Sequence, residues 1–383
     1  MGDLIYLDAA ATSKYGNADD IIVNAIATAM RKSWMNPSSL YATNIKEEIN
    51  KCRDNVAKFI GAEHNEIYFT SGSSESNNWA IRGWIDANVN FAHLLNVITT
   101  PIEHKSILKV LYDGCLCARI HYCDVDKHGF VNYKDLERLL SEHEYGSTLV
   151  SINMANNEIG TIQSIRMLAD LVHKYGGVLH TDATQALGHI PINVKELDVD
   201  MMSCSGHKIS PVLRGIGYLY KKKCINIRPL IYGTQENGLR GGTENTYGII
   251  GLSKAIEYCN LNDEKEICNK RNYFIDLLDR KFGCKLNGHS VYRLPNNINV
   301  TFPQNITGES LLYTLDLSGI AISVGSACNS YSIAPSHVLK AIGLTDDDAM
   351  RTVRFTLPND ITYEEIKIAI CEIEKAIKLI EIN

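Results

Sequence analysis

Short apolar runs alternate with amphipathic stretches over residues 65–260. Four of these runs, at positions 67–69, 149–152, 178–180 and 201–202, are typical of buried strands. Polar or glycine-containing residues follow each run. The alternation predicts βα units that form a mostly parallel sheet, and in such sheets ligands bind beside the carboxyl ends of the strands. We therefore expect the loops after these strands to share one binding crevice.

The end of the chain has a different pattern. Between Glu364 and Ile380, isoleucines recur at helical spacing, at positions 366, 370, 373, 377 and 380. This spacing predicts an amphipathic helix whose apolar stripe packs into a core. The segment 261–270 is polar and rich in charge, which makes it a candidate boundary before a second domain.

The composition places the chain among ordinary globular proteins. Its 383 residues are 45% hydrophobic and 21% charged, and the formal net charge is -6. A chain without a basic excess is not drawn to phosphate backbones, so we expect no direct binding to nucleic acid. The N-terminal residues do not have the pattern of a secretion signal, and no stretch has the apolar length that a bilayer requires. These features predict a cytoplasmic protein without membrane contact.

The cysteines indicate free thiols. There are eleven of them, an odd number at irregular spacing, which does not fit a disulfide framework. Cys115, Cys117 and Cys123 come nearest to a metal-binding cluster, but they lack the paired spacing of a zinc site. We therefore expect no bound metal.

Polar residues that follow the predicted strands provide the candidate chemistry. Residues 71–76 read Ser-Gly-Ser-Ser-Glu-Ser and open a helix, so they could bind a phosphate or act only as a helix cap. Asp182 follows another strand, where a carboxylate either caps a helix or pairs with a buried cation. Lys208 follows a third strand. Taken singly, a lysine in that place is usually solvated.

Together, these three features indicate a chemistry that none of them indicates alone. A pyridoxal phosphate enzyme needs a lysine that binds the cofactor covalently, a carboxylate that keeps the pyridine nitrogen protonated, and a cup for the phosphate. Lys208, Asp182 and the 71–76 loop could supply these parts. The sequence therefore predicts a pyridoxal phosphate site at the carboxyl edge of the sheet.

Ordered motifs over nearly the whole chain support this interpretation. They are Tyr6-Leu7-Asp8-Ala9-Ala10-Ala11-Thr12, Asn36-Pro37-Ser38-Ser39, Phe69-Thr70-Ser71-Gly72, Glu75-Ser76-Asn77-Asn78, Glu103-His104, Asn156-Asn157-Glu158-Ile159-Gly160, Asp182-Ala183-Thr184-Gln185, Ser205-Gly206-His207-Lys208, Arg240-Gly241-Gly242-Thr243, Gly325-Ser326-Ala327-Cys328 and Pro335-Ser336-His337-Val338-Leu339. With these motifs the sequence resembles the pyridoxal-phosphate-dependent cysteine desulfurases of the NifS/IscS-like type, which belong to the class V aminotransferases of fold-type I.

The resemblance implies a fold and a domain division. The fold is α/β, with a large domain built on a mostly parallel seven-stranded sheet and a smaller α+β domain. The large, cofactor-binding domain is expected at residues 15–260. The small domain is expected at residues 1–14 and 261–383, and it carries the loop with the reactive cysteine.

The resemblance also implies roles for single residues. Lys208 is expected to bind the cofactor, His104 to stack on its ring and be available to shuttle protons, and Asp182 to pair with the ring nitrogen. Taken alone, His104 would more readily be interpreted as a core or capping histidine. Gln185 is implied to bond to the ring hydroxyl, and Asn157 to lie at the cofactor and substrate. The implied phosphate contacts within the same subunit are Ser73, Ser74, Ser205 and His207. Thr243 is implied to reach the phosphate from the other subunit of a homodimer.

Two further residues are implied to act on the substrate. Arg354 matches the position that binds the substrate carboxylate, a role that suits a planar and always charged guanidinium. Cys328 lies among small residues before Pro335, in a stretch that suits a mobile loop. The resemblance implies that its thiolate takes the sulfur of L-cysteine, which leaves L-alanine and a persulfide. The sulfur would then pass to an acceptor protein, for iron–sulfur cluster assembly or tRNA thiolation.

Two loops depart from the family pattern. After Lys208 the family has a tight Gly-Pro-Lys-Gly loop, whereas here the loop at 209–217 is one residue longer and lacks the first glycine. After Arg354 a second arginine of the family is missing, because the chain reads Thr-Leu-Pro-Asn at 356–359. These changes leave open a catalytically impaired paralogue that acts as a binding partner. A second alternative is another class V enzyme, such as a selenocysteine lyase or β-lyase, against which Cys328 argues.

Overall fold

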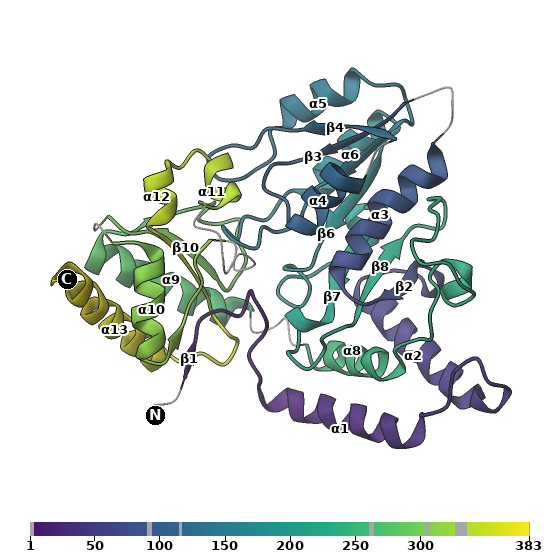
Figure 1. The fold of residues 1–383 in the computed structure, drawn as a ribbon, viewed down its shortest axis with the longest axis horizontal. Coiled ribbons are helices and arrows are strands. Elements are labelled where there is room, and N and C mark those ends of the chain that lie inside the picture. Colours follow the sequence, from purple (N-terminus) through teal and green to yellow (C-terminus); the bar gives the residue numbers. More distant parts are fainter. Residues whose placement is uncertain are drawn as a thin grey trace.

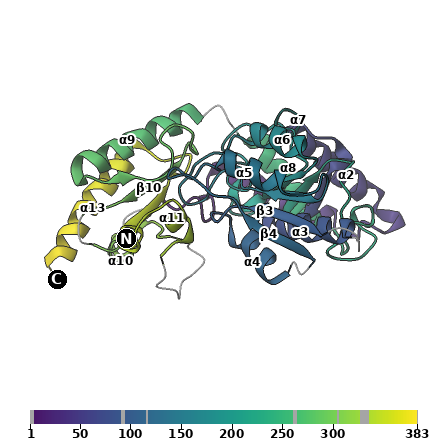
Figure 2. The same ribbon diagram turned by 90° about the horizontal axis from the view of Figure 1, so that it is seen from above.

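The structure, a computed structural model, describes residues 4–89, 94–114, 117–259, 264–303, 306–325 and 335–382. These residues form two lobes of unequal size, with the N-terminal arm passing from the smaller lobe into the larger one (Figure 1). Seen from above, the two lobes lie side by side (Figure 2). The first and last described elements, near residues 5 and 382, both belong to the smaller lobe.

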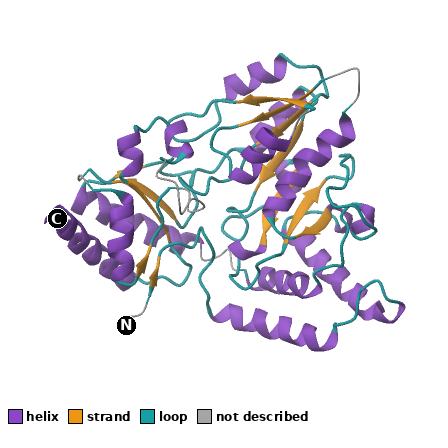
Figure 3. Cartoon of the chain, in the orientation of Figure 1, coloured by secondary structure: helices purple, strands orange, loops and turns teal. Residues whose placement is uncertain are grey.

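The larger lobe is built on a seven-stranded sheet that lies between helices (Figure 3). In spatial order its strands are β2 (Ile67–Thr70), β8 (Gly217–Lys221), β7 (Met201–Ser205), β6 (Val178–Asp182), β5 (Thr148–Ser151), β3 (Leu95–Thr99) and β4 (Ala118–Tyr122). The neighbours from β7 to β4 are parallel, and β8 runs antiparallel to both β7 and β2. The mostly parallel seven-stranded sheet is thereby confirmed.

The strands are apolar throughout because both faces of the sheet are covered. Successive side chains of a strand point to opposite faces. Leu149 and Met201 therefore join one buried core, while their neighbours Val150 and Met202 join the core on the other face. The helices of this lobe are α1 (Asn17–Lys32), α2 (Thr43–Phe59), α3 (Ser73–Asn88), α4 (Lys105–Gly114), α5 (Tyr133–Ser141), α6 (Ile165–Lys174), α7 (Val194–Leu197) and α8 (Thr246–Tyr258).

The two faces carry different helices. Helices α3 and α4 supply Trp79, Trp84 and Ile107 to one core, whereas α1, α2, α5, α6 and α8 pack on the other. The lobe also has four short 3-10 helices, at η1 (Leu40–Ala42), η2 (His64–Glu66), η3 (Gly206–Lys208) and η4 (Glu236–Gly238). Because α3 follows β2 and α4 follows β3, and both strands run in the direction of the central strands, each helix begins at the carboxyl edge of the sheet.

The smaller lobe has its own core. It contains α9 (Glu264–Phe282), α10 (Gly308–Leu317), α11 (His337–Ala341), α12 (Asp346–Met350), α13 (Tyr363–Ile382), β1 (Ile5–Tyr6), β9 (Lys285–Leu286), β10 (Asn297–Thr301), β11 (Ile320–Ala321) and β12 (Thr352–Thr356). The predicted C-terminal helix is confirmed as α13, which buries Ile366, Ile370, Ile373 and Ile377. Ile5 and Leu7 of the N-terminal arm pack into this core rather than into that of the larger lobe.

The domain boundaries predicted from the sequence stay a prediction. The separate cores of the two lobes support a division into two domains. Residues 264–270 form the start of α9, so the charged part of the expected boundary segment is helical. Every helix within the described parts of the chain is too short or too polar to cross a membrane.

Candidate functional site

Loops at the carboxyl edge of the sheet converge with the N-terminal arm. Strand β6 ends at Asp182, and β7 ends at Ser205 and leads directly into η3, which carries Lys208. On the other side of β7, the turn after β2 opens α3. The sequence places these groups far apart, and the parallel sheet brings them to one edge.

A cavity of about 380 Å³ lies at the start of α3. Its lining residues are Thr12, Ser71, Gly72, Ser73, Ser74, Glu75, Ser205, His207, Arg214 and Gly215. Helix α3 has Gly72 as its N-cap and no side-chain cap, so N–H groups of its first turn stay available to an anion. The predicted phosphate residues Ser73, Ser74, Ser205 and His207 therefore line one cavity.

Gly72 is a glycine for a steric reason. Its φ of 147° and ψ of 178° lie in a region that is essentially closed to residues with a side chain. A Cβ at this position would lie in ordinary contact with Oγ of Ser205, at 3.4 Å, so the restriction comes from the backbone conformation. The missing side chain lets the backbone turn into α3 beside the cavity wall.

His207 contributes a neutral ring to this cavity. Its Nδ1 lies 2.8 Å from Oγ of Ser205. Burial lowers the pKa of His207 to about 4, and the neighbouring Lys208 adds to the effect. At neutral pH the ring therefore supplies hydrogen bonds rather than charge. Among the described lining residues, Arg214 and Glu75 carry the formal charges, and Glu75 forms an ion pair with Arg240 at 2.8 Å.

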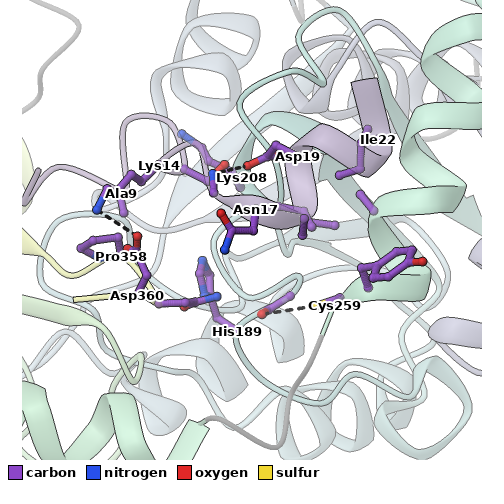
Figure 4. Close-up of a pocket in the computed structure, with 18 of the residues that line it drawn as sticks. Ala9, Lys14, Asn17, Asp19, Ile22, His189, Lys208, Cys259, Pro358 and Asp360 are labelled. Atoms are coloured by element: carbon purple, nitrogen blue, oxygen red, sulfur yellow. Dashed lines mark hydrogen bonds and ion pairs between the residues drawn. The ribbon is translucent and has the colours of Figure 1, made fainter. Parts of the chain in front are cut away.

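Lys208 directly follows His207, which lines this cavity, and it contacts the N-terminal arm. Its Nζ donates hydrogen bonds to the carbonyl oxygens of Ala10 and Ala11, at 2.6 and 2.8 Å. The side chain is half-buried. It lines a second cavity, of about 240 Å³, whose lining also includes Lys14, His189 and Asp360 (Figure 4). The lysine therefore joins the arm to the loops at the carboxyl edge of the sheet.

The longer loop after Lys208 is firmly packed. Ser210 donates a hydrogen bond from its hydroxyl to the Asp19 carboxylate of α1, and Leu213 is buried. The amide of Gly206 donates to the carbonyl of Ile216 at 2.9 Å, which closes the loop at its base. In this loop Arg214 is exposed and lines the phosphate cavity.

Asp182 is held by two donors at the end of β6. One carboxylate oxygen accepts from the amide of Thr184 at 2.9 Å, and the other accepts from Nδ2 of Asn77 at 2.7 Å. Gln185 is directed to the N-terminal arm, where its Nε2 donates to the carbonyl of Ala10 at 3.0 Å. Gln185 and Lys208 therefore contact the same carbonyl of the N-terminal arm, and Asp182 ends the strand next to the one that precedes Lys208.

His104 is both a capping histidine and a member of the site. It precedes α4, and its Nδ1 accepts a hydrogen bond from the amide of Ser106 at 3.1 Å. The hydroxyl of Ser106 lies 2.8 Å from the same nitrogen. Burial lowers the pKa of His104, although the Asp182 carboxylate opposes the effect. The two interpretations of this histidine are therefore compatible.

Arg354 is buried where the two lobes meet. Its Nη2 lies 2.7 Å from the Asp8 carboxylate, and its Nη1 donates to the carbonyl of Asn157 at 3.1 Å. Its Nε is buried without a hydrogen-bond partner among the described atoms. An unpaired donor on a buried guanidinium suits a carboxylate ligand, because leaving such a donor unpaired costs free energy.

The remaining predicted residues are Thr243 and Cys328. Thr243 is exposed and is not among the residues that line the phosphate cavity. Cys328 lies outside the described residues. The sequence interpretation missed Asn77, Ser106, Asp8 and Arg214, because nothing in their local sequence shows that they meet the site.

The residues present fit pyridoxal phosphate. The uncapped helix start and the hydroxyl-lined cavity suit the phosphate, Lys208 lies beside them, and Asp182 offers an acceptor for the ring nitrogen. The fold and this arrangement together define the fold-type I class of pyridoxal phosphate enzymes.

Comparisons with known proteins agree with this class. The family model of the class-V aminotransferases matches residues 5–368. A cysteine desulfurase IscS of Dictyoglomus turgidum is 41% identical, over 98% of this chain and 94% of its own. The structure of a NifS-like protein has a TM-score of 0.88 at 32% identity and covers 99% of this chain and 100% of its own. The structure titled SspA in complex with cysteine has a TM-score of 0.79 at 31% identity, over 93% of this chain and 99% of its own. The chain therefore belongs to the cysteine desulfurases of the class-V aminotransferase family.

Proposed function

We propose that this cysteine desulfurase holds pyridoxal phosphate on Lys208 and transfers the sulfur of L-cysteine to Cys328. The products are L-alanine and a persulfide on Cys328. The overall reaction balances without an external oxidant, since the C–S bond of cysteine is replaced by a C–H bond and the S–H bond of Cys328 by an S–S–H group. When bound, the cofactor supplies an electron sink for the electrons of the substrate.

The observation that carries this proposal is the position of Lys208. Its amine donates to the N-terminal arm, its neighbour His207 lines the phosphate cavity, and its charge acts on the same histidine, His104, as that of Asp182. A cofactor held at these three points has a fixed orientation, which is the contribution that a protein makes to cofactor chemistry. The structure titled SspA in complex with cysteine supports cysteine as the substrate class.

The residues of the chain have separate tasks in this proposal. The phosphate cavity and the Asp182 carboxylate orient the cofactor, while Arg354 binds the carboxylate of L-cysteine through its unpaired Nε. Asn157 lies next to Arg354 through its backbone carbonyl, which supports a place for its side chain near the substrate. His104 presents a neutral ring that can hold or release a proton at Nε2, because Nδ1 is occupied by Ser106.

The Cys328→Ser variant tests the sulfur transfer. It should bind L-cysteine and change the cofactor spectrum, yet form almost no alanine or persulfide, because a serine hydroxyl cannot replace a thiolate as acceptor. Alanine release and persulfide labelling are measured after single additions of L-cysteine. The Cys371→Ser variant, at an exposed cysteine of α13, is the control and should keep full activity. Retention of most activity by Cys328→Ser would assign the persulfide to another cysteine.

We further propose a homodimer with shared sites, in which Thr243 reaches the phosphate of the partner. The exposure of Thr243 and its position outside its own phosphate cavity support this arrangement. Two inactive variants, Lys208→Ala and Thr243→Ala, should regain partial activity when mixed under conditions of subunit exchange. One site of the mixed dimer then has both groups, and the other has neither. A mixture that stays inactive despite exchange would contradict the shared site.

The last parts of the proposal concern the sulfur acceptor and the location of the protein. We propose that the persulfide sulfur passes to an acceptor protein of the scaffold or tRNA-thiolation type, in the cytoplasm. The nine cysteines within the described part of the chain are free thiols, which supports a reducing location. Sulfur-transfer assays with partners recovered from the native cell would identify the acceptor.

A further inference from the structure

A chain of hydrogen bonds connects Asp182 to His104 through two residues that have no assigned role. Asn77 on α3 lies between them, and its Nδ2 is 2.7 Å from the Asp182 carboxylate and 2.9 Å from Oγ of Ser106. That hydroxyl is in turn 2.8 Å from Nδ1 of His104. Asn77 is fully buried, and Ser106 lies in the first turn of α4. Four residues from three separate elements thus form one continuous chain.

The direction of each hydrogen bond follows from the chemistry of Asp182. An ionised carboxylate can only accept, so the group of Asn77 that faces it must be the NH₂. The second N–H of that amide is then directed to Ser106, whose oxygen accepts it. The Ser106 hydroxyl must therefore place its own proton elsewhere. The nearby acceptor is Nδ1 of His104, which consequently carries no proton.

The backbone supports the same assignment. The amide of Ser106 also donates to Nδ1 of His104, at 3.1 Å. Two donors directed at one ring nitrogen leave Nε2 as the nitrogen that carries the proton of the neutral ring. The oxygen of the Asn77 amide has no partner among the described atoms, which is the cost of directing both of its N–H groups along this chain.

We propose that Asn77 and Ser106 are positioning residues that fix the proton of the His104 ring on Nε2. Because Asp182 only accepts hydrogen bonds, Asn77 donates to it and to Ser106, and the Ser106 hydroxyl then donates to Nδ1 of His104. This inference deepens the proposed function, since it assigns the proton-carrying nitrogen of a histidine in the cofactor site. It does not depend on bound cofactor, because all four side chains make these contacts within the protein itself. Its test is therefore made on the cofactor-free protein.

Several charged or titratable groups face His104. Asp182 of β6 favours protonation of the ring, while Lys208 of η3, His337 of α11 and Lys105 of α4 oppose it. None of these residues is changed in the variants below. A change in the titration of His104 between wild type and variant therefore reports the hydrogen bonds at Nδ1.

The measurement is nitrogen NMR of the histidine rings, with the His104 signals assigned from a His104→Gln variant. In the wild type, the neutral ring should show a proton on Nε2 and none on Nδ1. Ser106→Ala removes one donor to Nδ1 and should raise the pKa of His104 by about one pH unit, a tenfold change in its proton equilibrium. Ser106→Thr keeps the hydroxyl and should restore the wild-type titration.

Asn77→Leu should also raise the pKa of His104, because the Ser106 hydroxyl is then free to turn and accept a proton from the ring. Asn78→Leu is the matched control on the same helix. Its Nδ2 donates to the carbonyls of Ser74 and Ser106, so the variant loses two hydrogen bonds without touching the Ser106 hydroxyl. It should lower the melting temperature and leave the titration of His104 unchanged.

Two results would overturn the proposal. One is a wild-type ring with its proton on Nδ1, and the other is an unchanged His104 titration in the folded Ser106→Ala protein. Both are independent of cofactor loading. A protein that fails to bind pyridoxal phosphate but shows the expected titrations would contradict the proposed function and leave this inference intact.

Discussion

The two ends of the candidate cofactor site are built in different ways. The phosphate end is an open cavity whose donors are hydroxyl groups and the N–H groups at the uncapped start of α3. The ring end consists of buried side chains, Asp182 and Asn77, which are joined by a short hydrogen bond. Water can replace a lost partner at the open end, whereas at the buried end a lost partner leaves a polar group unpaired.

This difference predicts how each end responds to substitution. Backbone groups cannot be removed by mutation, so single side chains that line the phosphate cavity of their own subunit should each matter little. At the ring end the side chains of Asp182, Asn77, Ser106 and His104 are hydrogen-bonded in series, so one change is felt along the whole chain. Lys208 follows His207 of the phosphate cavity and carries the amine proposed to bind the cofactor.

The largest effect is expected from Lys208→Ala, which should abolish covalent attachment of the cofactor and with it the activity. Borohydride reduction of the wild type, followed by peptide mapping, should place the pyridoxyl group on Lys208. Lys221 is the control, because it is a buried lysine whose amine also donates to a backbone carbonyl, that of Ile225 at 2.8 Å. A pyridoxyl group on Lys221 or on any other lysine would refute the assignment.

The second effect tests the buried end. Asp182→Asn replaces an acceptor-only carboxylate by an amide and removes the charge that would pair with the ring nitrogen. Hydrogen bonds to charged groups contribute about 1.5–3 kcal/mol, so we expect activity to fall about 10- to 100-fold. Alanine production by the fully loaded variant measures this.

Asp200→Asn is the comparison variant for this effect. Asp200 is also a buried aspartate, and it binds His173 and Lys222 away from the site. That variant should lose stability but keep its activity per bound cofactor. An equal loss of activity in both variants would show that Asp182 acts through the fold alone.

The open and buried ends also differ in what the sequence could predict. Residues 71–76, Asp182 and Lys208 follow apolar strands directly, so the pattern that predicts the strands also places these groups at one edge of the sheet. Asn77 and Ser106 carry no such signal. They resemble ordinary helix residues, and their contact with Asp182 depends on how α3 and α4 pack together, which local periodicity does not specify.

The third effect tests the backbone of the phosphate end. Gly72→Ala forces a side chain into a conformation that is essentially restricted to glycine, and such strain costs about 1–3 kcal/mol. We expect a lower unfolding free energy and weaker binding of pyridoxal phosphate to the cofactor-free protein. Gly146→Ala serves as control, since Gly146 also has a positive φ, of 81°, but lies away from the cavity in open space. The Gly146→Ala variant should lose stability only. An unchanged cofactor affinity in Gly72→Ala would contradict the view that backbone groups at the start of α3 bind the phosphate.

The smallest effect concerns Arg214, the cation at the rim of the phosphate cavity. His207 is neutral because burial lowers its pKa to about 4, so among the described lining residues Arg214 is the one that offers full positive charge to a phosphate. Arg214 is exposed, and exposed ion pairs contribute only about 0.5–1 kcal/mol. Arg214→Gln should therefore weaken pyridoxal phosphate binding about two- to fivefold, while Arg214→Lys should retain most of the affinity.

Fluorescence titration of the cofactor-free protein measures this difference in affinity. The difference should vanish in 1 M salt, where the Debye length is about 3 Å. Pyridoxal, which lacks the phosphate, should bind all three proteins equally. A loss with Arg214→Gln that persists in high salt, or that also affects pyridoxal, would assign Arg214 to the packing of its loop instead of to the anion.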